Sequence, residues 1–216
     1  MDGYCERIEP GFWGEPLNAL SNIAFLIAAI AVWTGARHAS TRTLAVLIGL
    51  IFLGSSAFHT TATQWGAAAD SGFILVFLLY YLVLFGHVFA GLPWRRAWLA
   101  APAFVALTAV VALGANAIGF GGPGMYLSAL VVLIGIAVWC KGPERKLFAA
   151  ASVVFTVSLT LRTLDEPLCE SLPIGTHYFW HVLNAVTLYL ASLAVTRVVA
   201  GTRGGGSRSA TGSICE

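Results

Sequence analysis

Charged side chains are scarce in this sequence. Asp, Glu, Lys and Arg make up 10% of its 216 residues, whereas a soluble domain usually carries about 25%. Hydrophobic residues make up 58%. So little charge excludes an ordinary soluble domain and indicates a chain embedded in the hydrocarbon core of a bilayer. The net charge of only +2 argues against a nucleic-acid partner.

Two other features are missing. Four cysteines are too few for a disulfide-rich scaffold. The first sixteen residues lack the basic stretch that opens a secretory signal peptide. We therefore expect the first apolar run to remain in the mature protein as a membrane helix.

Seven apolar segments follow one another along the chain, each long enough to cross roughly 30 Å of hydrocarbon as a helix. They are 17–36, 43–59, 71–90, 97–114, 124–140, 147–164 and 178–199. The sequence predicts an all-α integral membrane bundle of seven transmembrane helices at 17–200, after an acidic extramembrane segment at 1–16. Residues 201–216 are rich in Gly and Ser without apolar periodicity, which predicts a disordered tail.

Basic residues lie almost entirely in connections on one side of the predicted bundle. That side has ten of the twelve Lys and Arg residues, and the other side has eight of the ten acidic residues. By the positive-inside rule the basic side is cytoplasmic, with the N-terminus outside and the C-terminus inside. We expect a multi-pass protein of the plasma or inner membrane in a bacterial host, or of an endomembrane in a eukaryotic one.

Three histidines lie at the outer ends of predicted helices. His59 ends the second segment, and His177 and His181 begin the seventh with the i, i+4 spacing that puts both on one face. Asp70 begins the third segment at the same depth, and Ser55 lies one turn before His59. Unpaired histidine is costly inside a membrane, and three neutral imidazoles with one open position suit catalytic zinc. The pattern therefore predicts a metal site.

Each residue alone has a simpler interpretation. His59 suits a membrane interface, Asp70 suits a helix N-terminus, and Ser55 suits close helix packing. The convergence of all of them at one depth favours the metal site. His38 and His87 fall on the opposite side, and we predict that both are interfacial residues.

Four stretches resemble the alkaline ceramidase family, within a superfamily of seven-helix membrane hydrolases that includes the progestin and adiponectin receptors. The stretches are Tyr4-Cys5-Glu6 with Glu15-Pro-Leu-Asn18-Ala-Leu-Ser21-Asn22, Gly54-Ser55-Ser-Ala-Phe58-His59 with Asp70, Leu164-Asp165 through Cys169-Glu170-Ser171-Leu172, and His177-Tyr-Phe-Trp180-His181. They stand in the family's order over nearly the whole chain up to the tail. Together they are specific, although no single stretch is.

The resemblance implies that His59, His177 and His181 bind zinc and that Asp70 and Ser55 act beside it. The family cleaves the amide of ceramide to a fatty acid and a sphingoid base, so a lipid amide is the expected substrate. In that reaction Asp70 would take a proton from the attacking water and pass it to the leaving nitrogen. Ser55 would donate a hydrogen bond to the developing oxyanion.

The resemblance also implies an N-terminal calcium site, and here the sequence departs from the family. Glu6 and Glu15 match acidic positions of the family, but Gly3 and Ile8 stand where an Asp and an Asn are expected. The candidate calcium ligands are Glu6, Glu15, Glu9 and Asp2.

The cysteines divide by membrane side. Cys5 and Cys169 both fall outside, in stretches covered by the resemblance, and we predict a disulfide between them. Cys140 and Cys215 fall on the predicted cytoplasmic side, where we expect both to stay reduced.

Two alternative functions remain, and the role of Asn184 is also open. A non-catalytic zinc-containing receptor would close its site with a fourth protein ligand, and Asp70 could be that ligand or a base. A b-type haem protein would need only two histidines and would give no role to Asp70 or Ser55. Asn184, one turn after His181, could orient a metal ligand or hydrogen-bond between helices.

Overall fold

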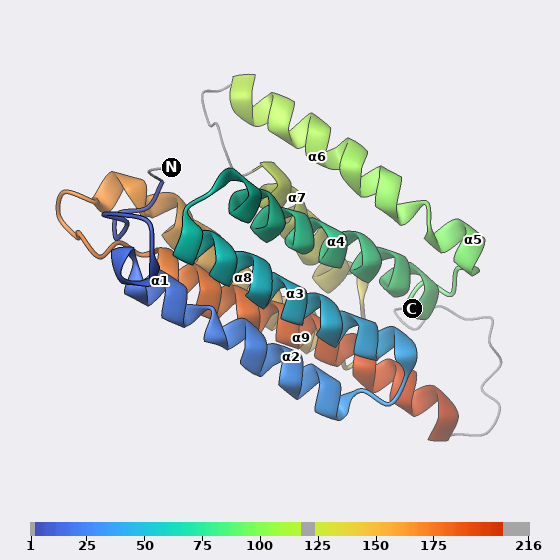
Figure 1. Cartoon of the computed structure of the whole chain (residues 1–216). Helices are drawn as coiled ribbons and strands as arrows, with labels where there is room; N and C mark the ends of the chain where they lie inside the picture. Colours follow the sequence, from blue (N-terminus) through green and yellow to red (C-terminus); the bar gives the residue numbers. More distant parts are fainter. Residues whose placement is uncertain (1–2, 118–123, 205–216) are drawn as a thin grey trace.

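The structure is a computed structural model that describes residues 3–117 and 124–204, and these residues form helices and no strand. The first half contains η1 (Phe12–Gly14), α1 (Pro16–Ser21), α2 (Ile23–Gly35), α3 (Ala39–Thr61), α4 (Gln64–Val88) and α5 (Trp94–Ala97). The second half contains α6 (Ala100–Ala117), α7 (Gly124–Trp139), α8 (Arg145–Leu164), η2 (Glu166–Leu168) and α9 (His177–Gly204). The long helices run side by side in one bundle (Figure 1).

Six helical stretches are long and apolar enough to cross a membrane. Two of them are composite, because α1 continues into α2 and α5 continues into α6. The fifth predicted segment, 124–140, corresponds to α7, which has 16 residues and is about 24 Å long. All seven predicted segments are therefore helices, but α7 is shorter than a hydrocarbon core of about 30 Å. The six long helices suggest a multi-pass membrane protein.

Most long helices of the bundle pack closely against their neighbours, whereas α6 packs more loosely. α3 packs along α4, α8 packs along α9, and α2 packs against both α3 and α9. α6 packs against α4 and α7, and most of its surface stays exposed (Figure 1). Such an exposed apolar surface suits contact with lipid.

The predicted boundary of the C-terminal tail is too early. We expected disorder from residue 201, but α9 continues to Gly204. A glycine inside a helix costs only about 1 kcal/mol relative to alanine, so Gly201 does not by itself end α9. Residues 205–216 lie outside the described residues. At the other end, the start of α1 at Pro16 agrees with an N-terminal segment of about sixteen residues.

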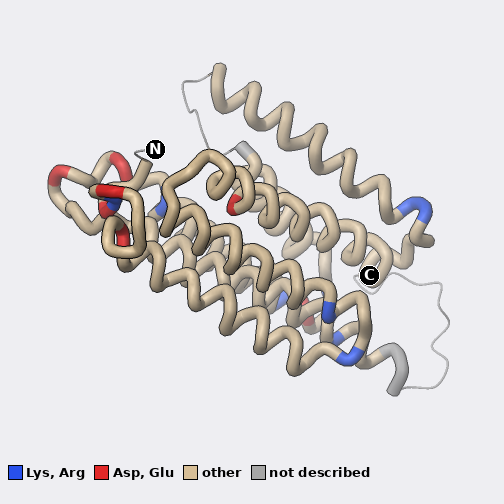
Figure 2. Tube along the Cα trace, viewed as in Figure 1, with Lys and Arg blue, Asp and Glu red and all other residues tan. Residues whose placement is uncertain are grey.

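The two ends of the bundle differ in charge, as the sequence predicts. Figure 2 shows the acidic residues gathered mainly at the end that holds the N-terminal segment, and most Lys and Arg at the opposite end. Among the described residues, Arg7 and Arg162 are basic exceptions at the acidic end, and Glu144 is an acidic exception at the basic end.

The predicted disulfide between Cys5 and Cys169 is present, with the two Cα atoms 4.9 Å apart. It joins the N-terminal segment to the connection between α8 and α9. The expectation that Cys140 stays reduced is wrong, because Cys140 is disulfide-bonded. That expectation used only the side of the membrane, which sets the redox environment but says nothing of which thiols lie close together. Cys215 lies outside the described residues.

Asp165 holds the same region by hydrogen bonds. Its buried carboxylate accepts from the backbone N–H groups of Thr176 (2.5 Å) and His177 (2.9 Å) at the start of α9, and from that of Cys5 (3.1 Å). Gly175 has φ +64°, and a Cβ there would lie 2.2 Å from the Asp165 carboxylate. Only glycine fits that turn, so the N-terminal segment and the first residues of α9 share one anchor.

A second glycine brings α3 close to α4. A Cβ on Gly54 would lie 2.7 Å from the Phe73 ring and 2.9 Å from the carbonyl oxygen of Ala69. Small residues permit such close approach of membrane helices. The contact lies next to Ser55 on α3 and to Asp70 on α4.

We predict that Gly54→Ala lowers the free energy of unfolding by about 1–3 kcal/mol, because the new methyl group would force α3 away from α4. The control is Gly49→Ala on the same helix, where an added Cβ has no neighbour within 4 Å. That change should raise stability by about 0.5–1 kcal/mol, since alanine is the better helix former. Thermal melting in detergent measures both. Equal effects of the two changes would contradict the close approach.

Candidate metal centre

The three predicted histidines meet between the end of α3 and the start of α9. His59, His177 and His181 are all buried, and one nitrogen from each lies within 4.8 Å of the others. Their ring centroids are 4.6–5.2 Å apart. In the part of the chain that the structure describes, this is the one group of three metal-ligand side chains found together.

Glu15 fixes the orientation of His59. The Nδ1 atom of His59 lies 2.8 Å from Oε2 of Glu15. A carboxylate can only accept, so Nδ1 carries the proton and Nε2 keeps its lone pair. Nε2 is buried and has no hydrogen-bond partner in the described part of the structure. A carboxylate behind a histidine in this way is the usual support for a metal ligand.

Ser21 has the same role for His181. Its hydroxyl oxygen lies 2.7 Å from Nδ1 of His181 and 3.0 Å from the carbonyl oxygen of Asn18. Because the hydroxyl donates its one proton to the carbonyl, it accepts from Nδ1 of His181. Nε2 of His181 is then left with its lone pair.

His177 is held by its backbone and by an aromatic neighbour. Its N–H donates to Asp165, and its ring stacks on Tyr4 with centroids 3.8 Å apart. Nδ1 of His177 is buried and, among the described residues, has no hydrogen-bond partner. Buried polar atoms are nearly always paired. Unpaired nitrogens on His59 and His177, facing one cluster, therefore fit a metal ion.

One short stretch supplies both supporting residues. The Glu6 carboxylate accepts from the backbone N–H groups of Leu17 (2.7 Å) and Asn18 (2.8 Å), and so caps the N-terminus of α1. Glu15, directly before α1, lies beside His59, and Ser21, the last residue of α1, lies beside His181. The stretch recognised by resemblance thus acts as a frame for two histidines.

Glu15 is a buried carboxylate with three partners. It also accepts from the Asn18 amide (3.0 Å) and forms an ion pair with the guanidinium of Arg7. Burial raises the pKa of Glu15, while the Asn18 hydrogen bond and the charge of Arg7 act in the opposite direction. Arg7 thus places a compensating positive charge beside this buried carboxylate.

Ser55 and Asp70 lie close together. The Ser55 side chain is buried and hydrogen-bonds to the Asp70 carboxyl. Asp70 does not belong to the three-histidine group.

Arg162 is the second basic residue at this end. Its guanidinium lies over the rings of Tyr126 (4.8 Å) and Trp180 (5.5 Å) and acts electrostatically on Asp70. Trp180 directly precedes His181 in α9.

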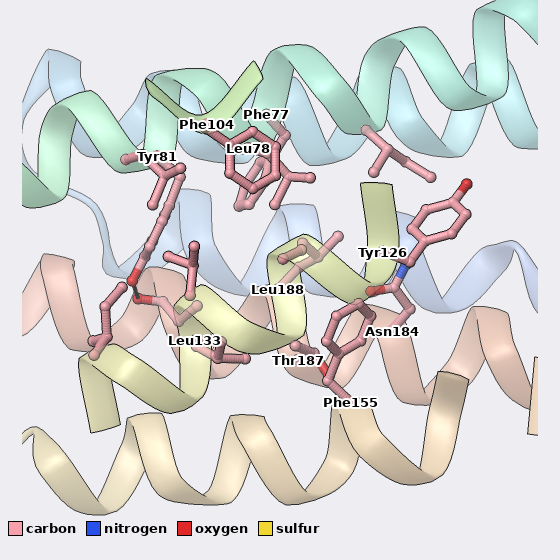
Figure 3. A pocket seen from close by; sticks show the side chains of 16 residues that line it. Phe77, Leu78, Tyr81, Phe104, Tyr126, Leu133, Phe155, Asn184, Thr187 and Leu188 are labelled. Carbon is pink, nitrogen blue, oxygen red and sulfur yellow. Dashed lines mark hydrogen bonds between the residues drawn. The ribbon is translucent and has the colours of Figure 1, made fainter. Parts of the chain in front are cut away.

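An apolar cavity lies between α4, α6, α7, α8 and α9 (Figure 3). It contains about 620 Å³ of empty space, including space open to the outside. Figure 3 shows aromatic side chains such as Phe77 and Phe155 around it, with Asn184 near Tyr126. The Tyr126 ring lies 4.8 Å from that of Trp180, so this end of the cavity lies next to the residue that precedes His181.

Other predicted residues have different surroundings. Asn184 lines the cavity. In the described part of the structure it forms neither a hydrogen bond to a metal-ligand histidine nor one to another helix. His87 donates from Nδ1 to the carbonyl oxygen of Leu92 (2.8 Å) and stacks on Trp94, away from the cluster. His38 precedes α3 at its opposite end.

The candidate calcium ligands do not form a cluster. Glu6 caps α1, Glu15 is paired with Arg7, and Glu9 is exposed. Asp2 lies outside the described residues. No acidic group of three appears within the described ranges.

Sequence reasoning missed Arg7, Ser21 and Arg162. Arg162 had a signal, since an arginine inside a predicted apolar span needs a local reason. Arg7 and Ser21 had no comparable signal, because their roles depend on contacts across the fold.

No known family model matches this chain, and no curated protein sequence matches it. The fold and the site define a helical protein suited to the membrane, with a buried three-histidine centre at one end.

We predict that the purified protein contains about one metal ion per chain, since three buried imidazoles converge on one point. The double change His177→Ala with His181→Ala should remove the ion, and His59→Ala should reduce its content strongly. His87→Ala is the matched control and should keep full content. Elemental mass spectrometry measures the ion, and full occupancy in the double variant would exclude this site.

Proposed function

We propose that the protein is a zinc-dependent membrane amidohydrolase that cleaves the amide bond of ceramide or a similar N-acyl lipid to a fatty acid and an amine. The observation that carries the proposal is the open three-histidine cluster beside the Ser55–Asp70 pair. The resemblance of four stretches to the alkaline ceramidases supports it.

The proposed topology has seven spans, of which the shorter α7 is the fifth, with the N-terminus outside and the C-terminus in the cytoplasm. The separation of charge between the two ends supports this orientation (Figure 2). The metal centre then opens toward the periplasm or the organelle lumen.

The histidines would hold zinc, which when bound polarises an amide carbonyl and acidifies water. Asp70 takes a proton from the attacking water and gives it to the leaving nitrogen as the carbon–nitrogen bond breaks. The water oxygen ends in the fatty acid, and the proton ends on the amine.

Ser55 has a second task that depends on the state of Asp70. While Asp70 is ionised, the Ser55 hydroxyl can donate to it. Once Asp70 holds the proton it becomes a donor, and the Ser55 hydroxyl is free to donate to the developing oxyanion. The pair therefore couples proton transfer to stabilisation of negative charge.

The apolar cavity suits the hydrocarbon part of the substrate. Its lining is almost entirely apolar or aromatic, as a hydrocarbon chain requires. One end lies next to Trp180, the residue before His181, so a chain in the cavity would extend toward the end of the bundle that holds the metal centre.

Two alternatives are less well supported. A b-type haem needs two imidazoles on opposite faces of a macrocycle, but the three rings here pack with centroids only 4.6–5.2 Å apart. A receptor with structural zinc would have a fourth protein ligand, and within the described ranges no carboxylate joins the cluster.

We predict that the purified protein hydrolyses at least one lipid in a panel of N-acyl lipids, measured by mass spectrometry of the released fatty acid. Asp70→Asn should keep its metal and lose about 10²–10⁴-fold in turnover, because a positioned acid or base contributes about that much.

Ser55→Ala should also lower turnover, and Ser56→Ala, on the next position of α3, should not. If Asp70→Asn hydrolyses at the wild-type rate, Asp70 is structural. If the metal-loaded wild type cleaves no lipid in the panel, the receptor alternative is favoured.

A further inference from the structure

Arg7 lies behind the metal centre in a buried chain of contacts. Its Nε and Nη2 atoms contact Oε1 of Glu15, and Oε2 of Glu15 contacts Nδ1 of His59. The side chains of Arg7 and Glu15 are only 3% and 1% exposed. A buried guanidinium is thus one carboxylate away from a candidate metal ligand.

The Arg7 guanidinium also lies over two aromatic rings. Its central carbon lies 4.6 Å from the Phe58 ring and 5.3 Å from the Tyr4 ring. Phe58 precedes His59, and Tyr4 stacks on His177. Arg7 therefore packs among residues that adjoin two of the three histidines.

The same region is where the resemblance implies calcium, and the side chains do not fit that ion. Calcium takes about 6–8 oxygen ligands. Both oxygens of Glu6 accept backbone N–H groups, and both oxygens of Glu15 are already used by Arg7, Asn18 and His59. The positive charge that a carboxylate requires here is present as an arginine.

We propose that the Arg7 guanidinium is a built-in cation that replaces calcium, and that through Glu15 it positions His59 for metal binding. This rests on the metal centre proposed above. Arg7 fixes the position of the Glu15 carboxylate, Glu15 accepts the proton of His59 Nδ1, and Nε2 keeps its lone pair. Arg7 is a positioning residue and the centre needs no calcium.

Arginine suits this place better than lysine. Its planar fork contacts a carboxylate through two nitrogens, stacks on aromatic faces and stays charged when buried. Lysine would keep the charge but lose the stacking and the fixed geometry. The proposal therefore predicts that Arg7→Lys is partly active in positioning and that Arg7→Met is not.

The first experiment measures zinc affinity of the full-length protein by competition with a chromophoric chelator. Arg7→Met should weaken affinity about 10–100-fold, the usual effect of losing support behind a metal ligand. Arg7→Lys should lie between Arg7→Met and wild type. The control is Arg42→Met, whose guanidinium also lies over an aromatic ring, that of Trp33 at 5.1 Å, but at the opposite end. It should bind zinc like wild type.

A double-mutant cycle tests whether Arg7 acts through Glu15. Glu15→Gln removes the charge but leaves an oxygen that can accept from His59, and the double variant with Arg7→Met contains neither a buried unpaired carboxylate nor a buried unpaired guanidinium. Adding Arg7→Met to Glu15→Gln should change zinc affinity less than twofold. A further loss of about 10–100-fold at this step would overturn the proposed path through Glu15, and this comparison does not require Arg7→Met alone to fold.

The visible absorption spectrum of bound cobalt depends on the geometry of its ligands. The visible spectrum of the cobalt-loaded protein should change in Arg7→Met and stay unchanged in Arg42→Met. An unchanged spectrum together with unchanged zinc affinity in Arg7→Met would show that Arg7 only packs the loop. If wild type itself binds no zinc or cobalt, the metal centre fails rather than the role of Arg7.

The proposal that the centre needs no calcium is tested by a separate measurement. Wild type in resin-treated buffer should contain no stoichiometric calcium by elemental mass spectrometry. Adding millimolar calcium should not change its zinc affinity or melting temperature. Stoichiometric calcium, or a rise in zinc affinity on adding it, would refute the replacement of calcium by Arg7.

Discussion

Three imidazole rings can be buried together in an apolar bundle only if their outward nitrogens have partners, because an unpaired buried polar group costs several kcal/mol on an alkane reference. The rest of this end of the molecule follows from that constraint. Glu15 and Ser21 take the outward nitrogens of His59 and His181, which directs the remaining lone pairs toward one another. α3 and α9 do not supply these partners themselves. The N-terminal segment and α1 must therefore dock against the bundle for the centre to exist.

The docking is fixed where the supporting segment meets the ligand helix. Cys5 is bonded to Cys169, and its backbone N–H shares the Asp165 carboxylate with the first N–H groups of α9. A shift of the N-terminal segment would disturb the cap of the helix that begins with His177. The positions of the supporting segment and of the ligand helix are thus mechanically coupled. This explains why the short N-terminal segment and the connection before α9 both belong to the site.

The sequence predicts the helices and the three histidines because both depend on local patterns. Apolar length identifies a span, and i, i+4 spacing with helix direction places His177, His181 and His59 at one depth. The length of α7, the continuation of α9 to Gly204 and the bonding of Cys140 were not predictable in this way, because each depends on neighbours in space. The role of Glu15 was also missed: an acidic residue in a loop fits a calcium ligand and a partner of histidine equally well until its contacts are known.

Two basic residues depart from the overall distribution of charge, and both can be related to a carboxylate. Basic residues collect at one end of the bundle, yet Arg7 and Arg162 lie at the other (Figure 2). Arg7 pairs with Glu15, and Arg162 acts electrostatically on Asp70. A carboxylate in low-dielectric surroundings stays ionised only with compensating charge or hydrogen bonds. The proposed chemistry needs an ionised Asp70 as base and an ionised Glu15 behind His59. Each of the two exceptional arginines therefore lies at the end of the bundle where the proposed chemistry needs a charged carboxylate.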